Sequence, residues 1–383
     1  MITLRKEFFG GLICDSLSGK IVQLNKPAFN ILERFLQNKN LEKDELQFIT
    51  SGVFNGINLL SNERRVIKSD KLNRHYLSAP ESVVIRLTTE CNLNCEGCYQ
   101  RKGKYIMFDF EKLKKLLDDI SAMGVFRIQL GGGEPIMYEK LLEVIEYAQK
   151  KALFVSVGTN GTLLSDSYIR KMKDFGVGHV QLSLTNPGID DELWFEKMLN
   201  LGLKLRSAGI QYGYNLIITR YNFNKLDKLI QFAQKSKPNK IKLLRVKYSN
   251  ENRCWYNKES INVSDNVLKT VFKKILNKYS NIELDCSYSM VNDDKYKLGC
   301  IAGNRTIIIL PNGDAGGCPF LLENNNYCDN IYKYKNIQSF WENSTCLTKM
   351  RKILSTKEGE INKLGLRKDR STCILFYDKK VID

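Results

Sequence analysis

A regular alternation of short apolar runs and helical patterns fills residues 82–247 and constrains the fold of this 383-residue chain more than any other feature. The helical patterns repeat apolar residues three and four apart, as at Leu113, Leu117 and Ile120. Repeated βα units predict an α/β fold with a parallel sheet covered by helices. Such sheets present their chemistry at the carboxyl ends of the strands. The predicted strands recur about every 26–32 residues after the first and lie at Val83–Leu87, Val125–Leu130, Leu153–Val157, His179–Leu184, Gln211–Ile218 and Ile241–Val246.

The segments on either side have other patterns. Residues 1–78 start with two runs, Phe8–Cys14 and Gly19–Leu24, that predict a β-hairpin, and helical stripes follow from Ala28 and from about Leu41. Residues 282–383 lose the alternation and hold six of the eleven cysteines. We therefore predict three domains, at 1–78, 79–281 and 282–383.

Composition restricts the chemistry. The only two histidines make His-rich metal sites and a Ser-His-Asp triad poor hypotheses. No run approaches the roughly 18 apolar residues of a membrane span, and the first residues lack the apolar core of a signal peptide. We therefore expect a cytoplasmic protein without a membrane partner. Disulfides are disfavoured in that compartment, so the eleven cysteines favour metal or cluster ligation.

The formal net charge is +17, from 59 Lys+Arg against 42 Asp+Glu. A basic surface attracts acidic partners such as nucleic acid, an acidic peptide or an anionic cofactor. A lysine-rich solvated surface from an A+T-biased genome explains the same count equally well. We do not expect nucleic acid as the partner, because no RNA-binding module is recognisable.

The strongest chemical signal is a loop directly after the first predicted strand, with Cys91, Cys95 and Cys98 at CxxxCxxC spacing. Three thiolates on one short loop can hold three irons of a [4Fe–4S] cube. The fourth iron then lacks a nearby protein ligand, which indicates an exogenous ligand and catalysis. The alternative, a basic zinc-bearing binding protein, needs a fourth Cys or His close by, and residues 15–253 offer no second cysteine pair.

This motif resembles the signature of the radical S-adenosylmethionine (SAM) family, and the resemblance covers residues 82–247. It implies a partial (β/α)6 barrel in which Cys91, Cys95 and Cys98 are the catalytic, cluster-binding residues. In that family the open iron chelates SAM, whose reductive cleavage gives a 5′-deoxyadenosyl radical. The resemblance also implies an electron donor such as flavodoxin or ferredoxin.

Further SAM-binding residues follow from the resemblance. Gly132, Gly133, Glu134 and Pro135 look like the family's GGEP motif, which binds the SAM amino group. Positions similar to Thr159, Asn160 and Ser183 contact the SAM carboxylate and ribose, although Asn160-Gly161 is also explained as an ordinary turn. Arg245 in the sixth strand would flank adenine and ribose. Gly97 stands where relatives have an aromatic residue, so we expect Tyr99 to supply that ring.

Two cysteines bracket a second predicted hairpin. A turn at Asn312-Gly313 would bring Cys300 and Cys318 together as ligands of one cluster. The pattern resembles the SPASM/Twitch extension of radical SAM peptide-modifying enzymes, which carries auxiliary [4Fe–4S] clusters. This chain lacks the later cysteine run of a full SPASM domain, so we expect one auxiliary cluster. Cys286 and Cys373 are the candidates for its remaining ligands.

We expect the other cysteines to have roles other than binding a cluster, or leave their roles open. Cys346 falls in a helical pattern and is expected in the core, whereas the role of Cys328 stays open. Cys14 and Cys254 are expected to be structural, because a free cysteine is commonly a small buried hydrophobe.

The N-terminal segment, with Lys6–Asp15, Leu24-Asn25 and Ala28–Leu32, resembles the PqqD-like leader-recognition element, the winged-helix-like fold of the pyrroloquinoline quinone peptide chaperone. Such modules bind an extended leader peptide as an added edge strand. A structural cap on the barrel is the alternative interpretation.

Together these resemblances predict a radical SAM maturase. It would install a thioether or a side-chain carbon crosslink in a ribosomally synthesised precursor peptide with a leader. The auxiliary cluster would take up the surplus electron or bind a substrate thiolate. The alternatives are a sulfatase-maturase-like or other oxidising radical SAM enzyme and a peptide epimerase. An RNA-modifying enzyme would use the charge most directly, and a molybdopterin-precursor synthase is disfavoured by the final residues Lys380–Asp383.

Overall fold

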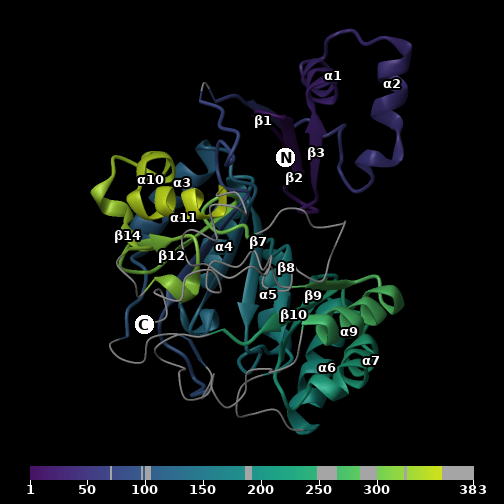
Figure 1. Cartoon of the computed structure of the whole chain (residues 1–383), viewed down its shortest axis with the longest axis vertical. Coiled ribbons are helices and arrows are strands. Elements are labelled where there is room, and N and C mark those ends of the chain that lie inside the picture. Colours follow the sequence, from purple (N-terminus) through teal and green to yellow (C-terminus); the bar gives the residue numbers. More distant parts are fainter. Residues whose placement is uncertain are drawn as a thin grey trace.

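The computed structural model describes residues 1–69, 71–95, 98–99, 105–185, 192–247, 265–284, 300–322 and 326–355. Four residues for which the sequence analysis made predictions lie outside these ranges, namely Gly97, Cys254, Cys286 and Cys373. The described residues form one four-stranded and one ten-stranded sheet (Figure 1). Within these ranges, no helix is both long and apolar enough to cross a membrane.

The ten-stranded sheet confirms the predicted α/β fold. Its six consecutive parallel strands are β5 (Ser82–Thr88), β6 (Arg127–Gly132), β7 (Phe154–Thr159), β8 (His179–Ser183), β9 (Gln211–Ile218) and β10 (Lys240–Arg245). The full order is β11-β10-β9-β8-β7-β6-β5-β12-β13-β14. The sheet is curved but not closed, because β11 and β14 are its two edges among the described residues. It is therefore a partial barrel.

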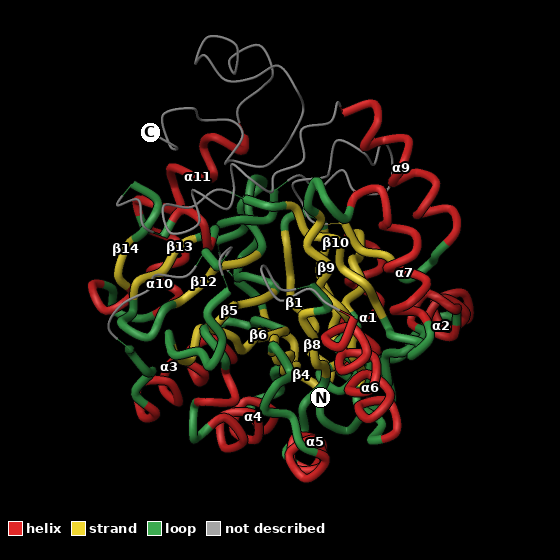
Figure 2. The backbone as a smooth tube through the Cα atoms, turned by 90° about the horizontal axis from the view of Figure 1, so that it is seen from below, coloured by secondary structure: helices red, strands yellow, loops and turns green. Residues whose placement is uncertain are grey.

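Helices cover the outer face of this barrel (Figure 2). Alternate strand residues such as Ile85, Leu130 and Val157 pack beneath them in one continuous core. Asp109 and Ser165 accept hydrogen bonds from the third backbone N–H after them and so cap α3 and α5. The helices are α3 (Phe110–Ala122), α4 (Leu141–Lys150), α5 (Asp166–Asp174), α6 (Glu192–Ser207), α7 (Leu226–Gln234) and α9 (Asp265–Lys278).

The C-terminal segment continues the same sheet. Strand β11 (Ile282–Leu284) pairs with β10, and β12 (Thr306–Ile309) pairs in parallel with β5. The boundary predicted at residue 281 thus lies within a continuous sheet, and the division into domains stays a prediction. The hairpin predicted at Asn312-Gly313 is confirmed, since β12 pairs antiparallel with β13 (Asp314–Gly316). Strand β14 (Asp329–Asn330) and helices α10 (Ile337–Asn343) and α11 (Thr345–Ser355) complete the segment.

The N-terminal segment forms the four-stranded sheet, in the order β3-β2-β1-β4. The predicted hairpin is confirmed as β2 (Gly10–Asp15) and β3 (Ile21–Asn25), and the predicted helices are α1 (Lys26–Leu36) and α2 (Lys43–Thr50). Strands β1 (Ile2–Glu7) and β4 (Arg64–Ile67) were not predicted, because their charged residues mask the strand pattern. Short 3-10 helices lie at Gly52–Phe54, Pro135–Met137, Phe223–Lys225, Pro319–Leu321 and Ile331–Lys333.

A buried ion pair fixes this module to the barrel. Arg5 is fully buried, and its Nε donates to Glu7 Oε1 at 2.9 Å. Its Nη1 donates to the carbonyl oxygens of Pro80 and Gly124, which precede β5 and β6. The Arg5 guanidinium also lies over the ring of Phe126. The module therefore packs at the amino ends of the barrel strands.

His179 lies on the interior face of β8 near the same end. It is buried, and its Nδ1 lies 3.4 Å from Ser156 Oγ. Burial, together with the positive charges of Lys240 and Arg127, lowers its pKa to about 3 from an ordinary value of 6.5. The folded chain therefore keeps this imidazole neutral.

This pKa predicts an acid-dependent loss of stability. Because the folded-state pKa of His179 is depressed, the stability it contributes is complete above pH 6.5 and is lost as the pH falls toward 3. At pH 5 the loss from this group should be about 2 kcal/mol, from 1.36 kcal/mol per pH unit over about 1.5 units. Urea unfolding of wild type and His179→Asn at pH 7.5 and 5 measures it. A pH dependence of the same size in both proteins would contradict the assignment to His179.

Candidate functional site

The three cysteines of the motif lie on the loop that leaves the carboxyl end of β5. The Cys98 N–H donates to the Cys95 carbonyl at 3.2 Å, and the Leu93 N–H donates to Cys91 Sγ at 3.4 Å. All three side chains are partly exposed. The described part of the loop thus has internal hydrogen bonds, and none of its three cysteines is fully buried.

Three thiols on one loop are the donor type that a [4Fe–4S] cluster takes. Within the described ranges, no three His, Cys, Asp or Glu side chains converge where one metal ion could be held. Each cysteine of a [4Fe–4S] cube binds a different iron, so its ligands need not converge on one point. A zinc site needs about four ligands around one ion, and the described residues offer no such set.

The loop after β6 packs directly on the cysteine loop. The Gly133 N–H donates to the Thr88 carbonyl at 2.8 Å, and the Glu134 N–H donates to the Glu90 carbonyl at 2.7 Å. A Cβ on Gly133 would lie 1.9 Å from the Glu90 oxygen, and one on Gly132 would lie 2.2 Å from the Thr88 oxygen. Gly132 also has a φ of +133°, which side-chain-bearing residues rarely adopt. The two glycines are therefore required by the close approach of the two loops.

Glu134 connects this loop to the next one. Its carboxylate is fully buried and accepts hydrogen bonds from Thr159 Oγ1 at 2.6 Å and from the Asn160 N–H at 2.8 Å. Burial raises the pKa of Glu134, and these hydrogen bonds oppose that rise. In this structure the carboxylate bridges the loops after β6 and β7. Contact of the motif with the SAM amino group stays a prediction.

Asn160 completes the bridge to the cysteines. Its Nδ2 lies 3.9 Å from Cys91 Sγ and donates to Asn92 Oδ1 at 2.9 Å, while Asn92 Nδ2 donates to Thr162 Oγ1. Burial raises the pKa of the Cys91 thiol, whereas the N–H groups of Leu93 and Asn160 act against that rise. Sequence reasoning missed Asn92 and Thr162, although Asn92 stands within the cysteine motif.

Tyr99 joins the cysteine loop to the C-terminal segment. Its ring packs against Phe320 with ring centroids 4.5 Å apart, and the guanidinium of Arg86 lies 5.1 Å from the Tyr99 centroid. Lys247 lies over the other aromatic ring, that of Phe320. Neither Arg86 nor Phe320 was singled out from the sequence, because their contact with Tyr99 depends on how the hairpin β12–β13 docks beside β5.

Ser183 and Arg245 are the last residues of β8 and β10. They lie at the carboxyl ends of the strands, as the cysteine loop does. The Ser183 carbonyl accepts from Trp194 Nε1 at 3.3 Å, and the Leu184 N–H donates to the Asn215 carbonyl. The structure thus brings the residues predicted to bind SAM together at the carboxyl ends of the strands. Contacts of Ser183 and Arg245 with SAM stay predictions.

The second cysteine pair flanks the β12–β13 hairpin, with Cys300 before β12 and Cys318 after β13. Cys300 and Cys318 are both buried. A Cβ on Gly317 would lie 2.5 Å from the Gly303 nitrogen and 2.9 Å from the Ala302 carbonyl carbon, so the backbones next to the two cysteines are in direct contact. This arrangement is compatible with one shared cluster, whose full ligand set stays a prediction.

Of the remaining described cysteines, Cys14 and Cys346 are buried and Cys328 is half-buried. Cys346 is buried as predicted, and its Sγ donates to the Ala315 carbonyl at 3.9 Å. Cys14 is buried as predicted, and burial raises its pKa to about 12. Burial likewise raises the pKa of Cys328 to about 12. Raised pKa values disfavour the thiolate forms of Cys14 and Cys328.

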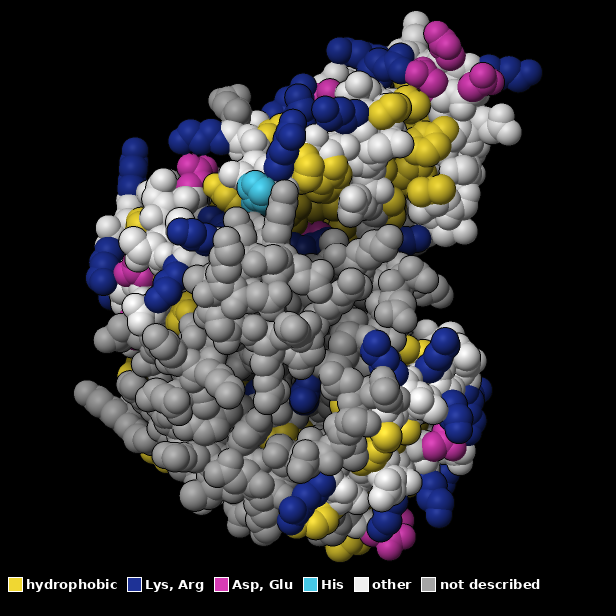
Figure 3. All heavy atoms as spheres, in the orientation of Figure 1, with side chains coloured by type: hydrophobic (Ala, Val, Ile, Leu, Met, Phe, Trp, Pro, Cys, Tyr) yellow, Lys and Arg dark blue, Asp and Glu magenta, His cyan; other side chains and the backbone are white. Residues whose placement is uncertain are grey.

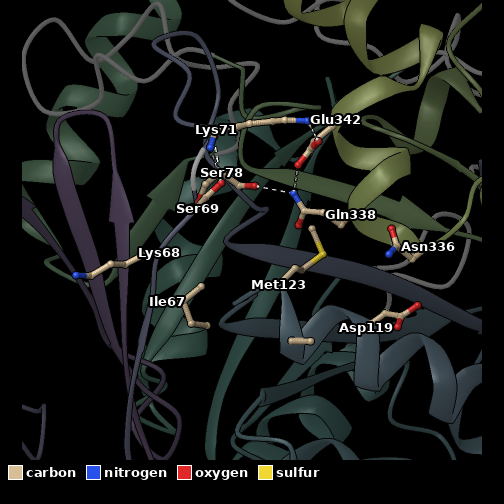
Figure 4. Close-up of a pocket in the computed structure, with 11 residues that line it drawn as sticks. Ile67, Lys68, Ser69, Lys71, Ser78, Asp119, Met123, Asn336, Gln338 and Glu342 are labelled. Atoms are coloured by element: carbon tan, nitrogen blue, oxygen red, sulfur yellow. Dashed lines mark hydrogen bonds and ion pairs between the residues drawn. The ribbon is translucent and has the colours of Figure 1, made fainter.

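A separate cavity of about 490 Å³ lies where the three segments meet (Figure 4). In it, Lys71 pairs with Glu342 at 3.5 Å, and Gln338 Nε2 donates to the Ser78 carbonyl at 3.4 Å. None of the residues expected to bind SAM or a cluster lines this cavity.

The comparisons with known proteins agree with this geometry. Residues 85–233 match the family model of the radical SAM superfamily. The chain carries a radical SAM domain. A PqqA peptide cyclase from Granulibacter bethesdensis is 24% identical over 184 residues, which are 45% of this chain and 49% of the cyclase. The chain thus spans about half the length of this relative. The mycofactocin maturase MftC of Mycolicibacterium smegmatis is 23% identical over 72% of this chain and 73% of its own.

Among solved structures, Streptococcus suis SuiB bound to S-adenosylmethionine matches with a TM-score of 0.69 and 18% identity. The match covers 100% of this chain and 98% of SuiB. It includes the N-terminal and C-terminal segments, so the likeness in fold extends beyond the radical SAM domain.

The glycine contact yields a testable prediction. Gly133→Ala should separate the two loops, because its Cβ cannot be placed beside the Glu90 carbonyl. We expect SAM affinity to fall by about tenfold or more, equivalent to about 1.4 kcal/mol, with iron incorporation also reduced. Gly52→Ala is the matched control, because the nearest atom would be 3.4 Å from its Cβ. Wild-type SAM binding in Gly133→Ala would contradict the account.

Proposed function

We propose that this chain is a radical SAM enzyme that installs a crosslink in a ribosomally synthesised precursor peptide. The observation that carries the proposal is the cysteine loop fastened to the GGEP loop at the carboxyl edge of a partial barrel. The names of its relatives support the peptide as substrate, since they include a PqqA peptide cyclase and a mycofactocin maturase. SuiB has also been solved bound to precursor peptide SuiA.

Cys91, Cys95 and Cys98 would hold the SAM-binding [4Fe–4S] cluster, and the Asn160 amide would favour the Cys91 thiolate. When bound, cluster and SAM supply the reductive cleavage that gives a 5′-deoxyadenosyl radical. The loops after β6, β7 and β8 would position SAM, with Glu134 keeping the first two together. A flavodoxin or ferredoxin would be the electron donor.

Cys300 and Cys318 would hold one auxiliary cluster, with Cys286 and Cys373 as candidates for the remaining ligands. The contact of Tyr99 with Phe320 places the hairpin of Cys318 beside the SAM cluster loop. A thioether or carbon crosslink removes two hydrogen atoms from the peptide, so its formation is a net oxidation. An auxiliary cluster favours such a product over epimerisation, which needs no net oxidation.

The N-terminal module would bind the leader. Strand β3 pairs with β2 on one side, and no described strand pairs with its other edge. Half-exposed apolar side chains lie on this strand and on α1, among them Val22, Ile31 and Phe35. Figure 3 shows hydrophobic side chains gathered on this module, with Lys and Arg around them. These features suit an extended, partly acidic peptide added as a strand.

The position of the module restricts the peptide. Because the module packs at the amino ends of the strands and the cysteine loop lies at their carboxyl ends, leader and modified residue are separated by at least one strand length. A strand of six residues spans about 20 Å. The precursor therefore needs roughly six or more extended residues between its leader motif and its modified residue.

Mass spectrometry of the peptide tests the proposal. Reconstituted protein with SAM, reductant and the peptide of a neighbouring short reading frame should give a product lighter by two hydrogen atoms per crosslink. The product should be absent without SAM and with the Cys91/Cys95/Cys98→Ala variant. A peptide of unchanged mass but altered stereochemistry would favour the epimerase alternative, and turnover of a folded sulfatase-type substrate alone would favour the sulfatase-maturase alternative.

The leader assignment has its own test. Val22→Glu places a charge on the edge strand β3 and should weaken binding of the full precursor by about tenfold, since burying a valine contributes about 1.5–3 kcal/mol. Leu46→Glu, on α2 and already 48% exposed, is the control and should leave affinity unchanged. Equal affinities for Val22→Glu and wild type would favour the structural-cap interpretation.

The auxiliary cluster is tested by iron and acid-labile sulfide after anaerobic reconstitution. We expect about eight iron per wild-type chain and about four in a Cys300→Ala/Cys318→Ala variant, because each cube holds four. About four iron in both proteins would remove the auxiliary cluster from the account.

A further inference from the structure

One row of residues crosses the interior face of the barrel below the cysteine loop. The strand registers pair Arg86 of β5 with Gly131 of β6, Gly158 of β7 with Gln181 of β8, and Gln181 with Gly213 of β9. Side chains alternate between the two faces of a strand. The neighbours of Arg86, Ile85 and Leu87, belong to the core under the helices. Arg86 and its row therefore face the interior.

The glycines in this row make room, and one of them leaves open space. A Cβ on Gly158 would meet Gln129 Nε2 at 3.5 Å, and one on Gly213 would meet Gln181 Oε1 at 3.0 Å. Among the described residues, no atom would lie within 4 Å of a Cβ on Gly131. Gly131 has no left-handed φ, so its backbone does not require glycine. The open space beside Arg86 is thus not explained by a backbone conformation that requires glycine at position 131.

Two buried donors face this row without partners. Arg86 is only 8% exposed, and its buried Nη2 has no hydrogen-bond partner among the described residues. Gln181 is 5% exposed, and its Nε2 likewise has none within the described ranges. In the described part of the chain, the contact recorded for Arg86 is its stacking on Tyr99, and no carboxylate pairs with it. A buried donor without an acceptor is costly, so these groups point to a ligand that carries acceptors.

We propose that Arg86 binds a carboxylate of the substrate peptide in the open space beside Gly131. A guanidinium matches a carboxylate with two parallel hydrogen bonds, and Tyr99 holds it in place by stacking. Because Tyr99 follows Cys98 directly, the carboxylate would be held close to the reacting end of the barrel. This inference rests on the proposed function and names its substrate class: a peptide with an acidic side chain or a free C-terminus near the modified residue.

Three small probes test it on the full, reconstituted protein with SAM bound. N-acetylglutamate α-amide carries a side-chain carboxylate, N-acetylglutamine carries a terminal one, and N-acetylglutamine amide carries neither. A ligand that binds the folded state raises the thermal unfolding midpoint. At matched ionic strength, at least one acid should raise the midpoint, and the neutral amide should not. Whichever acid acts identifies the source of the carboxylate.

Arg86→Gln should lose this response while keeping wild-type iron content, and Arg220→Gln, an exposed arginine, should keep it. Gly131→Val, which leaves Arg86 in place but fills the open space, should also lose it. No response to either acid in wild type, or a full response in Arg86→Gln, would overturn the proposal. A tenfold or greater loss of SAM affinity in Arg86→Gln would overturn it too, because Arg86 would then serve SAM.

These measurements do not require catalytic turnover. The carboxylate site and the proposed function can therefore be refuted independently of each other. If wild type responds to an acid but modifies no peptide, the carboxylate site stands and the proposed function fails. If wild type crosslinks a peptide but responds to neither acid, the proposed function stands and the carboxylate site fails.

Discussion

Two backbone hydrogen bonds join the loop after β6 to the loop that carries the cysteines, and the geometry of the candidate site depends on them. They form only because Gly132 and Gly133 have no side chains to hold the loops apart. Glu134 then extends the same connection to the loop after β7 through its buried carboxylate. Three strand ends are thereby held in one arrangement before any cofactor binds, which lowers the entropic cost of binding.

Both ends of the barrel strands make contacts with other segments of the chain. At the carboxyl ends, the GGEP loop packs on the cysteine loop, and Tyr99 of the cysteine loop contacts Phe320, which follows Cys318 closely. At the amino ends, Arg5 and Glu7 fix the N-terminal module, and Arg127 donates to the Gly19 carbonyl of that module. This module is thus a firmly docked part of the barrel and also a candidate binding surface, so the cap and leader-binding interpretations are compatible.

Sequence reasoning succeeded where a local pattern carried the information. The Asn312-Gly313 turn is a short motif, and the strands and helices follow from periodicity. It failed where the answer depends on register and docking. In the sequence, Arg86 is one charged residue in an apolar strand. Only its pairing with Gly131 in the structure shows that it faces an open interior. Phe320 was missed for the same reason, because its partner Tyr99 is distant in sequence.

In the proposed enzyme, Cys91, Cys95 and Cys98 hold a cluster that SAM contacts directly. This arrangement can be tested by electron paramagnetic resonance of the anaerobically reduced protein, before and after addition of SAM. We expect a cluster signal that changes when SAM is added and a complete loss of that SAM-sensitive signal in the Cys91/Cys95/Cys98→Ala variant. A spectrum that SAM leaves unchanged, or a SAM-sensitive signal that survives removal of the three cysteines, would contradict it.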